Sequence, residues 1–107
     1  MRSPLSTGER VPARFFHAVT AGDQHAEAAS RCAFGTAIVY FRERAGLTTE
    51  AAARQADLSP QAFRAIERGE AEPDWGTARR LAPAVGVDLP QLADAVERLE
   101  RGETLPA

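Results

Sequence analysis

Arginine is the residue of this sequence with the most evident chemical role. All 13 basic side chains are arginine, and the chain contains no lysine and no asparagine. A guanidinium group binds phosphates and the edge of guanine through two parallel hydrogen bonds, which is the chemistry of nucleic-acid recognition. A gene rich in G and C would produce the same abundance of arginine and alanine. The abundance of arginine therefore does not indicate a function, but the positions of particular arginines can.

The charge balance limits the class of nucleic-acid binder. The chain has 15 acidic side chains and a net charge of -2. A protein that coats nucleic acid without regard to sequence is usually basic overall. The mild acidity argues against such a protein, but it leaves room for a small basic face on an acidic body.

Residues that could support catalysis or metal binding are sparse. His17, His25 and Cys32 match no zinc-ligand spacing. A single cysteine also excludes an internal disulfide and a zinc site made of cysteine alone. The sequence shows no nucleophile–base pair, phosphate-binding loop or carboxylate pair at a catalytic spacing. We expect a protein that is not an enzyme and that has no metal and no other cofactor.

The size of the chain fits one domain with a thin core. Of its 107 residues, 44% are hydrophobic, but 22 residues are alanine. Such a core gives modest stability, which association with a second copy would increase. No apolar run approaches the roughly 20 residues of a membrane span, and the N-terminus lacks the pattern of a signal peptide. A soluble cytoplasmic protein is the resulting expectation.

Residues 1–33 differ from the rest of the chain. The first ten residues are rich in Ser, Pro, Thr and Gly and are expected to form a mobile arm. Val11, Phe15, Phe16 and Val19 recur at helical spacing, which predicts a short helix that ends at Gly22. A second, weak helix is expected over residues 24–32, after Asp23.

From Phe34 onward every apolar period is helical, and no stretch alternates as a strand does. The sequence therefore predicts an all-α fold, with a main domain over residues 34–101 and a tail over 102–107. Side chains that cap helix N-termini precede four of the expected helices, namely Thr48, Ser59, Asp74 and Asp88. The five helices are expected at residues 35–45, 49–56, 60–68, 75–85 and 89–101.

The segments 49–56 and 60–68 are joined by the turn 57–59, which predicts helix-turn-helix geometry. Three stretches at fixed distances, RERAGLTTE, ADLSPQAFRAIERGEAEP and RLAPAVGVDLPQL, resemble the phage-repressor (Cro-like) helix-turn-helix family of transcriptional regulators. The resemblance covers about residues 34–92. It implies a five-helix repressor-like DNA-binding domain whose core includes Leu58, Phe63 and Ile66.

The resemblance also implies a site on the helix at 60–68. In this family the N-terminal half of that helix enters the major groove of double-stranded DNA. Gln61 would bind adenine and Arg64 would bind guanine. The full set of expected base contacts is Ser59, Pro60, Gln61, Arg64 and Ala65, and the expected contacts with the DNA backbone are Thr49, Arg54 and Arg68. The positions of Arg42 and Glu67 imply a structural ion pair rather than DNA contacts.

Some residues depart from the family pattern. Asp57 stands where the turn normally has glycine, and Ala51 and Ala52 replace larger residues. Pro83 lies within the expected helix at 75–85, where it removes a hydrogen bond and kinks or destabilises the helix. The loop 70–74 is acidic. These departures weaken the case for DNA affinity more than the case for the fold.

The last expected helix carries apolar residues beyond the family core. Leu89, Leu92, Val96 and Leu99 are three, four and three residues apart, as in the seam of a coiled coil. One interpretation is a homodimer seam formed by Leu92, Val96 and Leu99. In the other interpretation the first two leucines serve the core, and Val96 and Leu99 pack on the aromatic N-terminal helix. Phe15, Phe16 and Trp75 are further candidates for a dimer surface.

Two functions follow from these patterns. The first is a repressor that binds a palindromic operator as a homodimer through residues 60–68. The second is a protein-interaction module on the same fold, such as an antitoxin or a regulatory subunit that holds a partner protein. The acidic body, and the weaker packing of helix 49–56 that Ala51 and Ala52 cause, favour the second. Steep loss of affinity with salt would distinguish the first.

Overall fold

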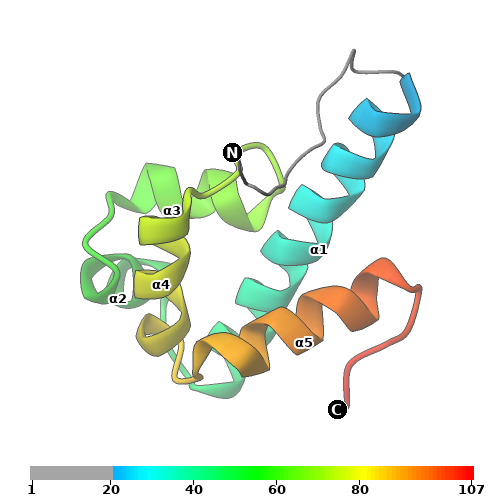
Figure 1. Ribbon diagram of the computed structural model, residues 1–107. Coiled ribbons are helices and arrows are strands. Elements are labelled where there is room, and N and C mark those ends of the chain that lie inside the picture. Colours follow the sequence, from blue (N-terminus) through cyan, green and yellow to red (C-terminus); the bar gives the residue numbers. More distant parts are fainter. Residues whose placement is uncertain (1–20) are drawn as a thin grey trace, which may run out of the picture.

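The computed structural model describes the backbone of residues 21–107 and the side chains from Glu27 onward. This part of the chain has helices and connections but no strand, so the expected all-α fold is confirmed. The helices, shown in Figure 1, are α1 (Ala21–Arg44), α2 (Thr49–Gln55), α3 (Pro60–Glu67), α4 (Trp75–Ala84) and α5 (Leu89–Glu100). The arm and the first helix expected in residues 1–20 lie outside the described residues.

The first described helix is longer than the sequence predicts. Separate helices were expected over 24–32 and 35–45, but α1 runs for 24 residues without a break. The prediction that Gly22 ends a helix is also wrong, since Gly22 and Gly35 both lie inside α1. A single glycine costs a helix only about 1 kcal/mol, so it need not interrupt one. Despite its length, neither α1 nor any other helix in residues 21–107 is apolar and long enough to cross a membrane.

The four later helices begin where the capping residues predict. Each capping side chain accepts a hydrogen bond from the backbone N–H three residues ahead, which satisfies a donor that has no partner inside the helix. The pairs are Thr48 with Ala51, Ser59 with Ala62, Asp74 with Thr77, and Asp88 with Gln91. Pro83 lies in the last turn of α4, one residue before its end, so it interrupts the helix very little.

Five large side chains form the centre of the core. Phe63, Ile38, Leu81, Leu92 and Val85 are fully buried and come from four helices and the end of α4. Each contributes roughly 1.5–3 kcal/mol through burial. Small residues on α2 pack among them, namely Ala52, Ala53 and Ala56. The core is therefore built from a few large residues and many alanines, as the composition indicates.

The position of Leu92 bears on the two interpretations of α5, and the N-terminal helix that the second one invokes lies outside the described residues. Leu92 is only 1% exposed and belongs to the core of its own domain. Val96 and Leu99 are partly buried and pack against the same core. Leu92 therefore cannot contribute to a homodimer seam in this fold. The apolar periodicity of α5 reflects packing within the chain.

Helices α1 and α3 approach each other closely at Gly35. A Cβ atom at Gly35 would lie 2.5 Å from the carbonyl oxygens of Ile66 and Glu67, a distance that no real contact allows. The contact continues at the end of α3, where a Cβ at Gly69 would lie 3.1 Å from Cys32 Sγ. Glycine at these two positions lets α1 pack against the backbone of α3.

The C-terminal residues fold back onto the domain. Leu105 is partly buried against the core. The Tyr40 hydroxyl of α1 donates a hydrogen bond to the carbonyl of Pro106. Figure 1 shows this segment turning back after α5. The sequence predicts only a tail over residues 102–107, because a single leucine in a short polar segment has no periodicity.

Candidate nucleic-acid interface

The turn between α2 and α3 has the helix-turn-helix conformation. Asp57 adopts a φ of 60°, in the left-handed region that aspartate tolerates, so it can stand where the turn normally has glycine. The backbone N–H of Leu58 donates to the carbonyl of Ala53 at 2.9 Å. The Leu58 side chain packs against the core. These contacts fix the direction in which α3 leaves the turn.

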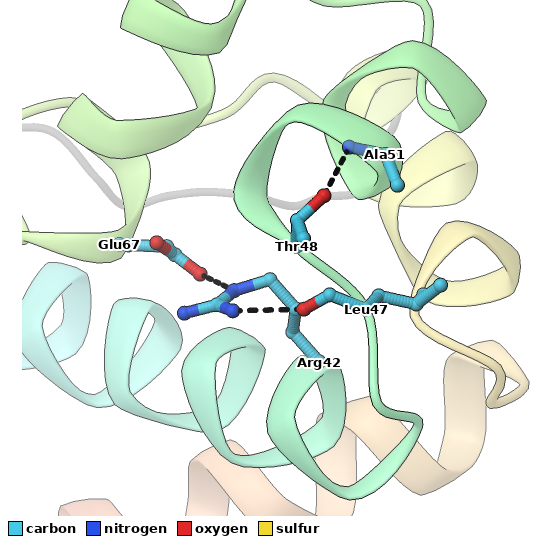
Figure 2. Close-up of polar contacts among 5 residues, drawn as sticks. All are labelled: Arg42, Leu47, Thr48, Ala51 and Glu67. Atoms are coloured by element: carbon cyan, nitrogen blue, oxygen red, sulfur yellow. Dashed lines mark hydrogen bonds and ion pairs between the residues drawn. The ribbon is translucent and has the colours of Figure 1, made fainter.

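Arg42 connects three parts of the domain. Its Nε atom donates to Glu67 Oε2 at 2.6 Å, and its Nη1 atom donates to the carbonyl of Leu47 at 3.0 Å. Figure 2 shows Arg42 of α1 between Glu67 of α3 and the loop before α2. The Arg42 side chain is 16% exposed and the Glu67 side chain is 10% exposed. Such a pair sets the register of the helices, and removing one partner would leave a largely buried charge. Arg42 and Glu67 are therefore engaged inside the domain.

Arg80 makes a second link between helices, which no pattern in the sequence predicts. Its Nε atom donates to the carbonyl of Ala56, at the end of α2, at 2.9 Å. The carbonyls at the end of a helix have no partner inside it, and a cation there also interacts favourably with the helix dipole. Arg80 thus attaches α4 to the end of α2. Arg80 and Ala56 are 24 positions apart, which explains why no local pattern in the sequence predicts the contact.

Three of the expected base contacts lie together at the start of α3. Ser59, Pro60 and Gln61 are all exposed. The Ser59 oxygen caps α3, so its hydroxyl proton remains available to a ligand. Pro60 has no N–H and can offer only apolar contact. Gln61 presents both a donor and an acceptor at the same end of the helix.

Arg64 lies one turn further along α3 and already has a partner. Its Nη2 atom is 2.5 Å from Glu50 Oε2 on α2. The Arg64 side chain is 40% exposed and the Glu50 side chain 54% exposed. Both side chains remain within reach of a ligand, but a guanine that binds Arg64 must compete with the carboxylate or share the guanidinium with it. Ala65, the remaining expected contact, is half-buried.

The three residues that are expected to contact the DNA backbone differ in their surroundings. Arg54 on α2 is exposed. Arg68, at the end of α3, is exposed and lies 4.0 Å from Glu70. Thr49 is half-buried in the first turn of α2. Two cations of this surface therefore face acidic neighbours, so the surface is less positive than its arginines alone indicate.

No group of three or more His, Cys, Asp or Glu residues in the described part of the chain is arranged to hold a metal ion. The hydrogen bonds from Thr77 lower the pKa of the Asp74 carboxyl at the start of α4, so this cap stays charged.

The helices and their turn define the class of protein as an all-α domain with a helix-turn-helix. The family model described as "Helix-turn-helix domain" matches residues 33–95, which is more than half of the chain. The chain belongs to this family. The match does not distinguish the Cro-like phage repressors from the other members of the family.

Solved structures of a regulator have a similar fold. One crystal structure of the clp gene regulator ClgR from Corynebacterium glutamicum has a TM-score of 0.65 and 24% identity, over 67% of this chain and 77% of that chain. A second crystal structure of ClgR from C. glutamicum has a TM-score of 0.61 and 25% identity, over 64% of this chain and 87% of that chain. No curated protein matches the chain.

Proposed function

We propose that this protein is a sequence-specific DNA-binding transcription regulator that acts in the cytoplasm without catalysis. The observation that carries the proposal is the surface of α3. Gln61 is exposed there, and Arg64 is partly exposed one turn further along the helix. The domain holds α3 in place through Arg42 and the turn at Asp57. The helix-turn-helix family and the likeness to a gene regulator, ClgR, support the same function.

In the proposed complex, α3 lies in the major groove. Gln61 binds adenine and Arg64 binds guanine, while Ser59, Pro60 and Ala65 complete the contact. Thr49, Arg54 and Arg68 bind phosphates on either side. We further propose a repressor that binds a palindrome as a homodimer, with half-sites about 34–36 Å apart.

The dimer contact is not assigned to the α5 seam. With Leu92 in the core, only Val96 and Leu99 remain, and both are already partly buried. Two such side chains supply far less than the roughly 1,200–2,000 Å² that a stable interface buries. We therefore place the homodimer contact outside this seam.

Binding to the DNA upstream of the protein's own gene tests the proposal. A labelled duplex is titrated with the wild-type protein and with Gln61→Ala and Arg64→Ala, in the presence of random-sequence competitor. Each substitution should weaken specific binding by about 1–3 kcal/mol, or roughly 5- to 150-fold. Arg101→Ala is the matched control, because Arg101 is also an exposed arginine in an ion pair but lies at the end of α5. Equal binding by wild type and both α3 variants would contradict the site.

A protein-interaction module is the second candidate. The contacts of Arg64 with Glu50 and of Arg68 with Glu70 favour it, because they reduce the positive charge available to phosphates. A regulator with several phosphate contacts loses DNA affinity steeply as salt rises, whereas an apolar contact with a protein does not. Association that persists in high salt, without specific DNA binding, would support the module.

A further inference from the structure

An apolar groove lies on a face of the domain that the proposed function does not use. It has a volume of about 310 Å³ and runs between α1, α4 and α5. Phe34, Trp75, Ala78, Leu89, Ala93 and Val96 line it. A second hollow of about 250 Å³ continues it past Ser30 and Arg31 on α1, and Trp75 lines both. Together they form one groove beside α1, which we call the Trp75 groove.

Trp75 marks this groove as a surface that lacks its partner. Trp75 is 67% exposed, and it is the one large hydrophobic residue that is exposed in the part of the chain that the structure describes. Tryptophan buries a large apolar area when a partner covers it, so leaving it in water is unfavourable. Nothing in the fold requires a tryptophan at the first residue of α4, because the Asp74 cap begins this helix.

The charges around the groove favour a basic occupant. Glu97 and Glu100 line one part, and Glu72 and Asp74 line the other. Arg31 is the basic residue among them. The occupant should therefore combine apolar side chains with arginine or lysine.

The chain itself contains such a segment. Residues 11–19 carry Val11, Phe15, Phe16 and Val19 at helical spacing, together with Arg14, and they contain no acidic residue. Residues 1–20 as a whole have three arginines and one glutamate. We propose that segment 11–19 of the same chain occupies the Trp75 groove, with its phenylalanines against Trp75 and its arginine toward the acidic rim.

The connection to α1 gives this segment the reach it needs. Thr20 leads directly into Ala21, where α1 begins. A segment that returned along α1 as a helix would place Phe15 and Phe16 only about 6–8 Å from Thr20, short of Ser30, because a helix rises about 1.5 Å per residue. Ser30 lines the groove, and Phe34 follows one turn later. The proposal therefore takes the residues between Thr20 and Phe15 as extended: at about 3.3–3.6 Å per residue they span about 17 Å, which places Phe15 level with α1 between Ser30 and Phe34.

Trp75 is the only tryptophan of the chain, so its fluorescence reports on the groove in the full-length protein. We expect wild-type Trp75 to be protected from acrylamide quenching, to the same degree at every protein concentration. Phe15→Ser combined with Phe16→Ser should shift the emission to longer wavelength and increase quenching. Leu5→Ser, which replaces an apolar residue outside segment 11–19, is the matched control and should change neither.

A substitution on the groove itself provides the converse test. Ala93 is exposed on α5, so Ala93→Glu keeps the helix but places a bulky acid in the groove. It should expose Trp75 as the double phenylalanine variant does, whereas Ala29→Glu on α1 should not. Circular dichroism and urea unfolding confirm that all variants fold.

Two results would overturn the proposal. Wild-type quenching equal to that of the double variant would show that segment 11–19 does not cover Trp75. Protection that disappears on dilution would show that a second copy covers it. Neither measurement needs DNA. The groove proposal can therefore fail without contradicting the proposed regulatory function.

Discussion

In the proposed complex, Glu50 lies where it can control how Arg64 meets DNA. In the structure the two side chains form an exposed ion pair between α2 and α3. A carboxylate beside the recognition surface repels phosphates and occupies a donor that guanine needs. Glu50 is therefore expected to oppose binding to any polyanion. Only a ligand with a well-placed acceptor can offset the loss of the Arg64–Glu50 ion pair. No pattern in the sequence predicts this contact, because it joins residues 14 positions apart.

We expect Glu50→Gln to tighten DNA binding. An exposed ion pair contributes about 0.2–1 kcal/mol, so the affinity should rise roughly 1.4- to 5-fold. Fluorescence anisotropy with specific and random duplexes measures the effect, which should be larger for the random duplex because the acidic charge no longer opposes non-specific contact. Glu97→Gln on α5 is the control. A weaker affinity would instead mean that Glu50 orients Arg64 for the base.

At the scale of elements, the contact between α1 and α3 depends on Gly35. Helix propensity alone favours alanine over glycine by about 0.5–1 kcal/mol. The 2.5 Å approach to the carbonyls of Ile66 and Glu67 outweighs this preference, because backbone atoms cannot move aside. We expect Gly35→Ala to destabilise the fold by about 1–3 kcal/mol.

Gly76 provides the matched comparison for this prediction. It lies in α4, where an added Cβ would meet Asp74 Oδ1 at 3.6 Å, an ordinary contact. Gly76→Ala should stabilise the protein by up to about 1 kcal/mol. Urea unfolding of both variants measures the change in the free energy of unfolding. A change of the same sign for both variants would contradict the role of Gly35.

The Asp74 cap makes the stability of α4 depend on pH. The backbone N–H and side chain of Thr77 hold the pKa of Asp74 below its ordinary value of 3.8. A carboxyl whose pKa is lower in the folded state stabilises the fold above its unfolded pKa, and this contribution is lost as the pH falls through the folded pKa. Asp74→Asn keeps the cap but does not titrate.

We therefore expect the stability of the wild-type protein to fall faster than that of Asp74→Asn below about pH 4. Thermal unfolding between neutral and acidic pH checks this, and the two curves should run parallel above that range. Parallel curves throughout would mean that Thr77 does not hold the charged form of Asp74.

The sequence predicts the helix boundaries that depend on residues close by in the chain. The capping residues Thr48, Ser59, Asp74 and Asp88 place the starts of α2 to α5 correctly, because a cap acts within three residues. The sequence does not predict the length of α1, because that length depends on packing against α3 and α5 rather than on a local stop signal. The exposed residues Gln61 and Arg64 were named from family resemblance, and their contacts with DNA remain a prediction.

At the scale of the whole molecule, the C-terminal residues help to close the domain. Leu105 packs against the core, and Tyr40 binds the carbonyl of Pro106. We expect Leu105→Ala to lower the free energy of unfolding by about 1 kcal/mol, because the side chain is only partly buried. Thr104→Ala, at the exposed neighbour, should have little effect. Urea unfolding at a fixed protein concentration measures both, and an unchanged midpoint for Leu105→Ala would show that the segment does not pack.

Most arginines of the described chain are engaged by the protein itself. Arg42, Arg64, Arg68, Arg98 and Arg101 face carboxylates, and Arg31 and Arg80 donate to backbone carbonyls. Each occupied cation releases fewer counterions on contact with a nucleic acid, so attraction to arbitrary sequences is weak. A regulator of this kind would spend little time sliding along unrelated DNA. It would find its target mainly by repeated free collisions, and its occupancy would respond directly to its own copy number in the cell.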